Sequence, residues 1–385
     1  MKKIIILSLI LLTIFPTFTY AQENENNTNL LAQAKSGILM EASTGKILFE
    51  KNKDEKLSVA SMTKMVAQII ILEYIEQGKL SWDENVVTSE NASAMGGSQI
   101  YLATGEVMSV KDMMKGISMA SANDATVAMA EKIAGSEEEF VKMMNDKVKS
   151  LGLVNTVFKN STGLDEEGHY STAYDMAIIA RELLKHEQIL EFSSVYEDYL
   201  RTDTPDKFWL VNTNKLVRFY EGADGLKTGH TDDAKYCLAA TAKKEGMRLI
   251  AIVLGEEVST TRNKEAMNLL DYGFNTYKVT IIKAKGETVD KIKIDKANKD
   301  EIEIVPILDA SILSKKSDID KDYSFELKLK EINLPIKIKD VVGKLLIKDG
   351  NNIVQEVDVT VKENIEKIKF IPLLLKILKS MVSGN

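Results

Sequence analysis

The sequence predicts an α+β fold, in which an antiparallel sheet packed by helices is followed by a small all-β domain and a C-terminal amphipathic helix. Three observations support this prediction. Apolar hairpin patterns stand near both ends of the stretch 34–277, and helical patterns lie between them. Over 278–362 apolar residues alternate with Lys, Asp and Glu, which is the period of half-buried strands. Within 363–385 the apolar period becomes that of a helix.

Residues 1–21 have the pattern of a secretory signal peptide. Lys2 and Lys3 precede an apolar run over 4–14, and Ala21 ends a segment that suits a cleavage site. The apolar run is short for a membrane span, and an uncleaved anchor is the alternative. We expect the next residues, 22–33, to be a disordered mature N-terminus. The protein is therefore expected at the outer face of the cytoplasmic membrane, bound peripherally, or secreted.

Composition excludes several classes of function. The formal net charge of −7 argues against a general nucleic-acid binder, and no basic block with interleaved aromatic residues occurs. Cys237 is the only cysteine, which excludes an intramolecular disulfide. The three histidines, His169, His186 and His230, are scattered and show no metal-ligand spacing. We therefore expect neither a metal nor a cofactor.

Each element of the stretch 34–277 has its own signal. The apolar runs 38–40 and 47–49 flank a turn that contains Gly45 and predict a hairpin, and a second hairpin is predicted over 236–254. The region 110–134 predicts a helix that is interrupted around 118–123. Thr172 is a predicted N-cap, because Asp175 and an apolar helical face follow it. We expect the two hairpins to pair within one sheet.

Ser61 and Lys64 form the first candidate pair of catalytic residues. The apolar run after Lys64 contains no Pro or Gly until Gly78, which predicts a buried helix with Ser58 as its N-cap. Residues three apart lie on one helical face, so the hydroxyl and the amine would be neighbours. A serine needs a base to become a nucleophile, and a lysine can be that base only if burial or a nearby cation lowers its pKa. The spacing alone is a weak signal, because it also occurs by chance.

Two further motifs follow in order. Ser121 and Asn123 could relay a proton and bind a substrate amide if they lie in a non-helical break, although a helix-capping role is the common alternative. Lys227-Thr228-Gly229-His230 precedes the second hairpin and is expected at an edge strand. Gly229 would allow another backbone to approach closely, and Lys227 and Thr228 would present a cation and a hydroxyl to a carboxylate. A polar loop is the alternative for this motif.

Together the three motifs resemble the signature set of serine penicillin-recognising enzymes. Longer segments are similar to the low-molecular-mass penicillin-binding proteins that are D-alanyl-D-alanine carboxypeptidases; these segments are Ala60-Ser61-Met62-Thr63-Lys64-Met65, Ser121-Ala122-Asn123-Asp124-Ala125, Asn160-Ser161-Thr162-Gly163-Leu164 and Asp224-Gly225-Leu226-Lys227-Thr228-Gly229-His230-Thr231. The resemblance covers almost the whole mature chain. It implies a β-lactamase/DD-peptidase-like catalytic domain over 34–277, a β-rich domain over 278–362 and a membrane-anchor helix over 363–385.

The resemblance also implies an acyl-enzyme mechanism and the role of each residue. Ser61 would attack the peptide bond between the last two D-alanines of a peptidoglycan stem pentapeptide, with Lys64 as its base. Ser121 would relay a proton to the leaving D-alanine, and Asn123 would hold the acyl-side amide. Lys227 and Thr228 would bind the terminal carboxylate, and the backbone N–H groups of Ser61 and His230 would form the oxyanion hole. β-Lactam antibiotics would acylate the same serine. Some relatives carry an arginine where this chain has Thr213, which leaves open whether a second cation binds the carboxylate.

Three alternatives stay open. A class A-like β-lactamase would use a glutamate in a Glu-x-x-Leu-Asn loop, but this chain has no Leu-Asn dipeptide. A catalytically silent wall-binding protein would not need Ser61 and Lys64 intact. A crosslink-cleaving endopeptidase would use the same residues.

The last two segments carry no catalytic signal. The β-rich domain contains no His, Cys or Gly-rich loop, and we interpret it as a spacer or packing module. The apolar stripe that begins at Phe370 and ends at Met381 lies beside lysines, and we expect it to bind the membrane surface. A helix docked on the protein is the alternative.

Overall fold

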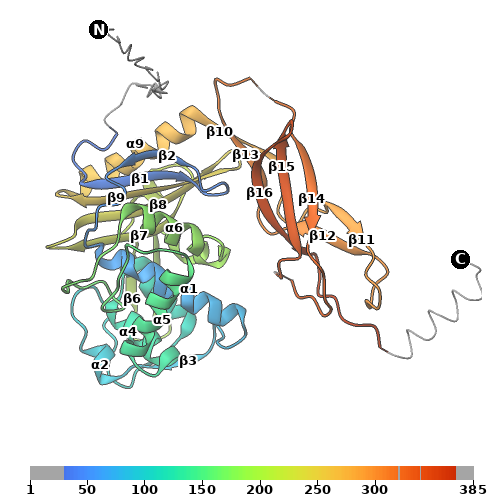
Figure 1. Ribbon diagram of the computed structural model, residues 1–385. Helices are drawn as coiled ribbons and strands as arrows, with labels where there is room; N and C mark the ends of the chain where they lie inside the picture. The colour runs from blue at the N-terminus through green and yellow to red at the C-terminus, as the bar shows by residue number, and fades with distance from the viewer. Residues whose placement is uncertain (1–29, 320, 339, 370–385) are drawn as a thin grey trace, which may run out of the picture. The chain divides into compact units, whose positions relative to one another are not determined.

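The computed structural model describes residues 30–319, 321–338 and 340–369 (Figure 1). The predicted signal peptide and the apolar stripe from Phe370 to Met381 lie outside these residues. Leu31 is buried, and the backbone N–H groups of Gln33 and Ala34 donate to the Glu265 carboxylate at 2.8 and 3.1 Å. Leu31 to Gln33 are therefore part of the packed structure, although they lie within the segment 22–33 that the sequence predicts to be disordered and before the predicted start of the catalytic domain at residue 34.

The first domain is built on a five-stranded antiparallel sheet with the strand order β2-β1-β9-β8-β7. Its strands are β1 (Ser36–Glu41), β2 (Ile47–Lys51), β7 (Ala223–Thr231), β8 (Lys235–Lys244) and β9 (Met247–Glu256). The two predicted hairpins pair through β1 and β9, with Ile38 opposite Ile252. This pairing confirms the expectation from the sequence, and it leaves β7 as an edge strand.

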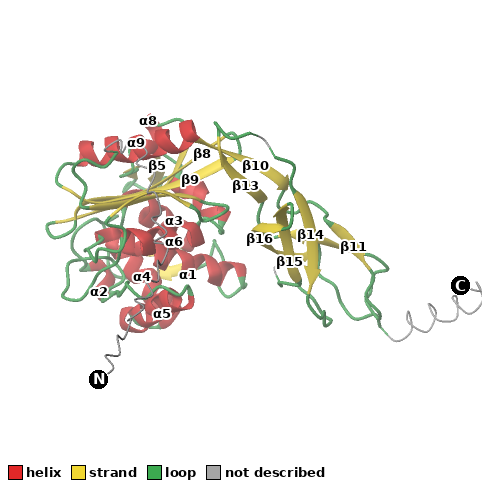
Figure 2. Ribbon diagram, turned by 45° about the horizontal axis from the view of Figure 1, so that its top comes forward, coloured by secondary structure: helices red, strands yellow, loops and turns green. Residues whose placement is uncertain are grey.

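Helices cover both faces of this sheet. The helix α9 (Ser259–Thr276) packs on β8 and β9, whereas α6 (Ala173–Leu183) packs on β9 and β1 from the opposite face (Figure 2). Beyond α6 lies α1 (Lys64–Glu76), which contacts α4 (Asn123–Ala134), α5 (Glu137–Ser150) and α6. All residues of α1 from Lys64 to Leu72 are buried, as expected for a helix that is apolar on every side. The helix α6 begins as predicted, because Thr172 accepts a hydrogen bond from the Asp175 N–H at 3.0 Å.

The start of α1 differs from the prediction. Ala60–Thr63 form a 3₁₀ turn, η1, and Ser58 does not cap the helix. Ala60 has a φ of 47°, which is incompatible with continuing a helix back to Ser58. The Ser58 hydroxyl instead donates to Asp165 Oδ1 at 3.3 Å. Ser61 therefore stands on a tight turn in front of the buried helix rather than within it.

The predicted interruption of the Met- and Ala-rich helix is confirmed. The helix α3 (Val110–Lys115) continues into a π-helical turn, η2 (Gly116–Ala120), and Ser121 then takes a left-handed conformation with φ 63°. The chain re-enters a helix at α4, whose first residue is Asn123. The Ser121 N–H donates to the Gly116 carbonyl and so closes the π-helical turn, after which the left-handed residue interrupts the helix before α4; such irregular segments are frequent at functional sites.

The other elements of this domain are short and connect the ones above. They are β3 (Asn85–Val87), α2 (Glu90–Ser93), β4 (Val107–Ser109), η3 (Glu187–Ile189), α7 (Leu190–Ser193), β5 (Glu197–Leu200), β6 (Phe208–Val211) and α8 (Leu216–Phe219). Two antiparallel pairs, β3 with β4 and β5 with β6, lie outside the main sheet. The domain ends with α9 at Thr276.

The second domain is all-β and has a core of its own. Its strands are β10 (Tyr277–Lys283), β11 (Asp290–Ile292), β12 (Ile302–Pro306), β13 (Ala310–Lys315), β14 (Ser324–Leu329), β15 (Gly343–Asp349) and β16 (Asn352–Val361). They form a β10–β13 pair and a five-stranded sheet with the order β11-β12-β16-β15-β14. The predicted alternation is confirmed where Ile302, Ile304, Val357, Val359 and Val361 are buried.

Two predictions for the second domain are corrected. The alternation at Ile336 and Ile338 does not form a strand, because Ile336 forms only an isolated bridge with Ile365 and the Ile338 N–H donates to the Asn364 side chain at 2.8 Å instead of continuing the ladder. That bridge also places Ile365 in the buried core, so residues 363–369 belong to the β-rich domain and not to the predicted helix. The β-rich domain is therefore longer than the sequence pattern indicated.

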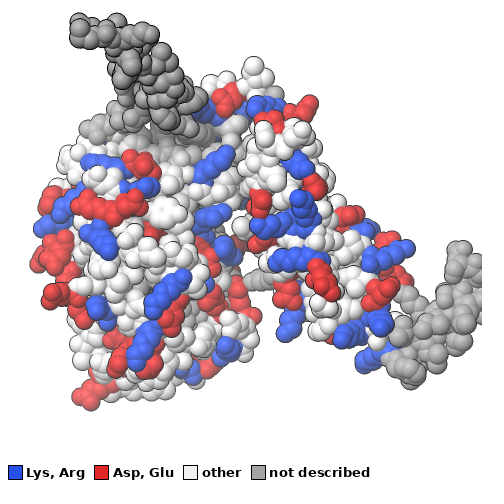
Figure 3. All heavy atoms as spheres, viewed as in Figure 1, with Lys and Arg blue, Asp and Glu red and all other residues white. Residues whose placement is uncertain are grey.

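On the face shown in Figure 3, side chains of both charge signs are interspersed, and neither sign dominates. Among the described residues, the helices are too short or too polar for any of them to span a bilayer.

Candidate active site

Segments from four parts of the first domain meet around Lys64. They are η1 with the start of α1, the start of α4, the loop 160–163 and the edge strand β7. Ser61 Oγ lies 2.8 Å from Lys64 Nζ, so the spacing of three residues brings the hydroxyl and the amine together as predicted. Ser61 is half-buried, whereas Lys64 is fully buried. A partly exposed hydroxyl therefore stands beside a desolvated amine.

The neighbours of Lys64 define where the lone pair would point if the amine is neutral. Nζ lies 2.6 Å from Asn123 Oδ1 and 2.6 Å from the carbonyl oxygen of Thr162. Both oxygens can only accept hydrogen bonds. A neutral amine has two N–H donors and one lone pair, so the two carbonyl oxygens take both donors and the lone pair faces the Ser61 hydroxyl. The geometry therefore suits a neutral Lys64 that accepts the Ser61 proton.

Burial and charge both favour the neutral amine. The pKa of Lys64 is held well below its ordinary value, first by burial and then by the positive charge of Lys227. Asp124 and Glu137 oppose this shift. Burial and the Arg262 charge lower the pKa of Lys227 itself to about 7. Burial is thus the main cause of the lowered pKa of both lysines, and each is lowered further by one nearby cation, Lys227 for Lys64 and Arg262 for Lys227.

Asn123 is held rigidly by the loop 96–98. Its Nδ2 donates to the Gly96 carbonyl at 2.7 Å, and its backbone N–H donates to the Ser98 carbonyl at 2.7 Å. The amide orientation is therefore fixed, with Oδ1 toward Lys64. Ser121 is buried in the left-handed break two residues earlier. The hydrogen bonds of Lys64 Nζ go to Ser61, Asn123 and Thr162, and not to Ser121.

The edge strand β7 carries the remaining predicted residues. A Cβ on Gly229 would lie 2.5 Å from the Val59 carbonyl oxygen, so only glycine lets β7 approach η1 this closely. Thr228 Oγ1 donates to Thr213 Oγ1 at 2.8 Å, which places Thr213 beside the predicted carboxylate-binding hydroxyl. The exposed His230 ring stacks on Tyr236 with 4.1 Å between ring centroids. The His230 side chain is therefore engaged outside the Lys64 cluster, as expected if only its backbone is used.

Several residues of the site were not predicted from the sequence. The Thr162 carbonyl has no sequence signal, because every residue carries a backbone carbonyl. Asp124 is buried and accepts hydrogen bonds from the N–H groups of Ile100 and Leu102, which anchors the loop that holds Asn123. Arg262 acts through its charge from α9, far from the motifs in the sequence. Of these three residues, only Asp124 had a signal in the sequence, because it is a charged residue directly beside a predicted motif.

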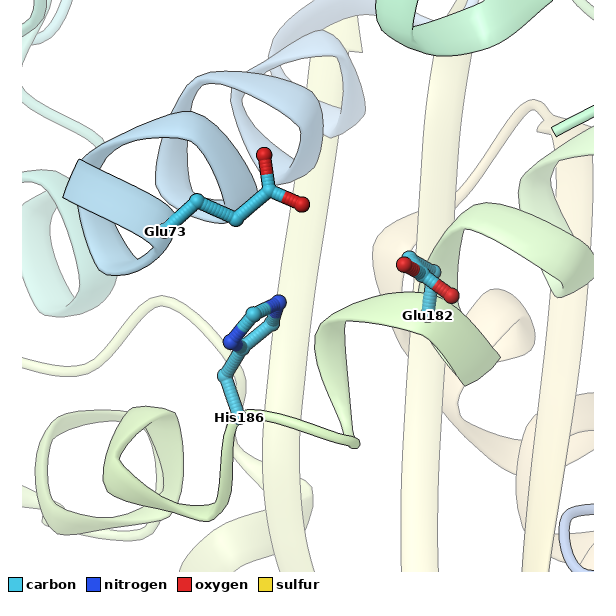
Figure 4. Close-up of side chains that lie close together, drawn as sticks. All are labelled: Glu73, Glu182 and His186. Carbon is cyan, nitrogen blue, oxygen red and sulfur yellow. The ribbon is translucent and has the colours of Figure 1, made fainter. Parts of the chain in front are cut away.

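A second cluster of titratable side chains lies apart from these residues. Glu73, Glu182 and His186 converge in Figure 4, and their ligand atoms lie within 4.8 Å of one another. Lys147 Nζ lies 2.5 Å from Glu73 Oε1 and 3.1 Å from Glu182 Oε1. The lysine ammonium thus already supplies the positive charge that these carboxylates need, so we interpret the cluster as an ion-pair network.

Known protein families match both domains. The family described as D-alanyl-D-alanine carboxypeptidase matches residues 22–258, and the family described as penicillin-binding protein 5, C-terminal domain, matches residues 277–367. The chain is 48% identical to D-alanyl-D-alanine carboxypeptidase DacF of Bacillus subtilis over 378 residues, which covers 97% of each chain. It is 32% identical to D-alanyl-D-alanine carboxypeptidase DacC of Escherichia coli over 87% of this chain and 84% of that one.

Solved structures agree with these matches. Penicillin-binding protein 5 from Haemophilus influenzae is 28% identical, with a TM-score of 0.67 over 87% of this chain and 98% of the other. Penicillin-binding protein D2 from Listeria monocytogenes, solved in an ampicillin-bound form, is 32% identical, with a TM-score of 0.57 over 63% of this chain and 97% of the other.

Proposed function

We infer that Ser61 is the acylated nucleophile of this protein. The chain belongs to the D-alanyl-D-alanine carboxypeptidase family. The chain is a serine-type D-alanyl-D-alanine carboxypeptidase, a hydrolase of the penicillin-binding group that acts on the peptidoglycan wall. The observation that carries the residue assignment is the surroundings of Lys64. Two carbonyl oxygens at 2.6 Å occupy its N–H groups and direct its lone pair to the Ser61 hydroxyl at 2.8 Å.

Acylation begins when the Ser61 oxygen attacks the carbonyl carbon between the two terminal D-alanines. The Ser61 proton passes to Lys64 as the bond from Oγ to carbon forms. The backbone N–H groups of Ser61 and His230 stabilise the oxyanion, and loss of one such donor costs about 3 kcal/mol. The carbon–nitrogen bond then breaks, and the leaving amine receives a proton through Ser121. Water attacks the acyl-enzyme, releases the tetrapeptide and restores the Ser61 hydroxyl.

The substrate is held on both sides of the reacting carbon. Asn123 donates to the carbonyl of the acyl-side amide, which its fixed orientation allows once the substrate enters. Lys227 and Thr228 bind the terminal carboxylate, and Thr213 supports the Thr228 hydroxyl. The edge position of β7 lets an extended peptide lie alongside it. A carboxylate beside Lys227 also raises the pKa of that lysine, so substrate binding itself favours the charged form.

Intact mass spectrometry after addition of benzylpenicillin tests these assignments. We expect a Ser61-dependent adduct that outlasts its formation many times over, and no adduct on Ser61→Ala. An adduct that disappears as the penicillin is hydrolysed would favour a β-lactamase. Absence of any adduct on a folded protein would contradict the assignment of Ser61. Release of D-alanine from a stem pentapeptide, compared with cleavage of a crosslinked dimer, separates carboxypeptidase from endopeptidase activity.

We further propose that the protein is exported and held at the outer face of the cytoplasmic membrane by an amphipathic C-terminal helix. The proposal is supported by the signal-peptide pattern over 1–21 and by the apolar stripe from Phe370 to Met381, whose period is helical. A chain that lacks residues 371–385 should stay in solution when the intact mature chain sediments with anionic lipid vesicles. Equal sedimentation of both chains would refute the anchor.

A further inference from the structure

His169 is a buried histidine that the mechanism does not use. Its Nδ1 accepts a hydrogen bond from the backbone N–H of Lys159 at 3.2 Å, and its Nε2 lies 2.8 Å from Thr63 Oγ1. Since the backbone N–H can only donate, Nδ1 carries the lone pair and Nε2 carries the proton of the neutral ring. Burial lowers the pKa of His169 to about 4, so the ring is neutral near pH 7. His169 therefore donates to the hydroxyl of the residue next to Lys64.

The ring stands at the base of the loop that supplies the Thr162 carbonyl. Val157 and Tyr170 form a backbone bridge that closes this loop, and the bond from Lys159 to His169 adds a further link just inside it. At the tip of the loop, a Cβ on Gly163 would lie 1.9 Å from the Ala60 carbonyl oxygen and 2.9 Å from Thr63 Oγ1. The loop thus reaches the turn before Lys64 at two places, through His169 at its base and through Gly163 at its tip.

The loop and α1 are also connected through the reacting amine. The Thr162 carbonyl lies 2.6 Å from Lys64 Nζ, and it takes one of the two N–H groups that a neutral Lys64 can donate. A shift of this carbonyl would free that N–H to donate to Ser61, and the lone pair would then turn away from the serine proton. The distance between this loop and Thr63 therefore sets the position of the Thr162 carbonyl.

From this geometry we propose that His169 is a positioning residue for acylation, which holds the Thr162 carbonyl against Lys64 by fastening the loop to Thr63. The inference rests on the proposed role of Lys64 as the base for Ser61. It assigns His169 no contact with substrate. The required chemistry is a neutral hydrogen-bond donor at the Nε2 position, so Gln can replace the ring and an aliphatic side chain of similar size cannot.

The test compares three variants of the mature chain in the rate of acylation by benzylpenicillin between pH 5 and pH 10, with the melting temperature measured alongside. His169→Leu should lower the acylation rate about tenfold, because the loss of one hydrogen bond displaces the carbonyl. His169→Gln should recover most of the rate. His186→Leu is the matched control, because it removes another buried histidine of the same domain that bonds to Glu76 and not to the site.

The pH profile separates positioning from a loss of stability. A carbonyl acceptor stabilises the ammonium form of Lys64 more than the amine, so its displacement lowers the pKa of Lys64 further. The acid limb of the rate profile should therefore move to lower pH in His169→Leu, by about half a pH unit or more. The other groups that act on Lys64, namely Lys227 from β7, Asp124 from α4 and Glu137 from α5, are unchanged in this variant.

The outcomes are distinct. An unshifted acid limb in His169→Leu, with a rate loss no larger than that of His186→Leu, would overturn the proposal. A His169→Gln chain as slow as His169→Leu would overturn it as well, because the donor would then be irrelevant. If the wild-type chain forms no Ser61 adduct at all, the proposed catalytic assignment fails before His169 is tested.

Discussion

Replacement of Lys227 by Met should stabilise the folded protein while it abolishes activity. Lys227 is buried, with 1% of its surface exposed, and its pKa falls from the ordinary 10.5 to about 7. Because the unfolded chain binds a proton at pH 7 that the folded chain holds only weakly, this lowered pKa destabilises the folded state by roughly 4 kcal/mol. Met occupies similar space and carries no charge. It forfeits the hydrogen bond from Nζ to the Thr228 carbonyl, which contributes about 1 kcal/mol.

The expected gain is therefore about 3 kcal/mol at pH 7, or roughly 2–4 °C in the melting temperature for each kcal/mol. The sign of its pH dependence follows from the same pKa. Between about pH 7 and pH 10.5 the unfolded chain binds more protons than the folded one, so the wild-type stability rises with pH and the advantage of Met declines. Below pH 7 both states are protonated and the advantage is at its maximum.

Denaturant unfolding of the Ser61→Ala background, with and without Lys227→Met, measures this difference at pH 6.5 and pH 9.5. Lys149→Met is the control, because 75% of that lysine side chain is exposed. A Lys227→Met chain that is no more stable than the control at pH 6.5, or whose advantage grows toward pH 9.5, would refute the argument that the site keeps a destabilising buried cation for function.

Three further predictions concern single positions. Thr213→Arg should lower KM for a D-Ala-D-Ala peptide about tenfold at pH 9, because a permanent cation would then stand beside Thr228 when Lys227 is mostly neutral; an unchanged KM in steady-state assays would contradict this. Glu256 is buried, neither of its carboxylate oxygens has a hydrogen-bond partner among the described residues, and burial together with Glu265 raises its pKa to about 7. The folded chain then binds the extra proton between pH 4.5 and 7, so stability falls as pH rises through this range, and Glu256→Gln should remove that fall in denaturant titrations; a persisting slope would show that another group causes it. Gly163→Ala should nearly abolish penicillin acylation, because its φ is +83° and a Cβ there would clash with the Ala60 carbonyl; acylation at the wild-type rate would show that the loop can move freely.

The local patterns in the sequence were sufficient for the outline of the fold. Alternation and glycine-containing turns predicted the two hairpins, and the unbroken apolar run after Lys64 predicted a helix buried on every side. The break at Ser121 was also visible, because polar residues interrupt a Met- and Ala-rich helix there. These features depend on neighbours in the chain, which is why a single sequence reveals them.

The boundaries of the domains were harder to predict from the sequence. Leu31 and Ile365 belong to the packed structure, although neither lies in a segment with a helical or strand pattern. Their burial depends on partners far away in the sequence, such as Glu265 for the backbone beside Leu31 and Ile336 for Ile365. No local pattern encodes such a partner.

For the candidate site, too, the sequence determined one part and the tertiary structure the other. The sequence by itself determined which residues carry reactive groups, because the identities and order of Ser61, Lys64, Asn123 and Lys227 are those of a known family. Only the tertiary structure decided how the Lys64 amine is directed, since the Thr162 carbonyl that orients it belongs to the backbone and could come from any residue type. Sequence records the chemistry of side chains, whereas the direction of a lone pair depends on atoms that folding brings together.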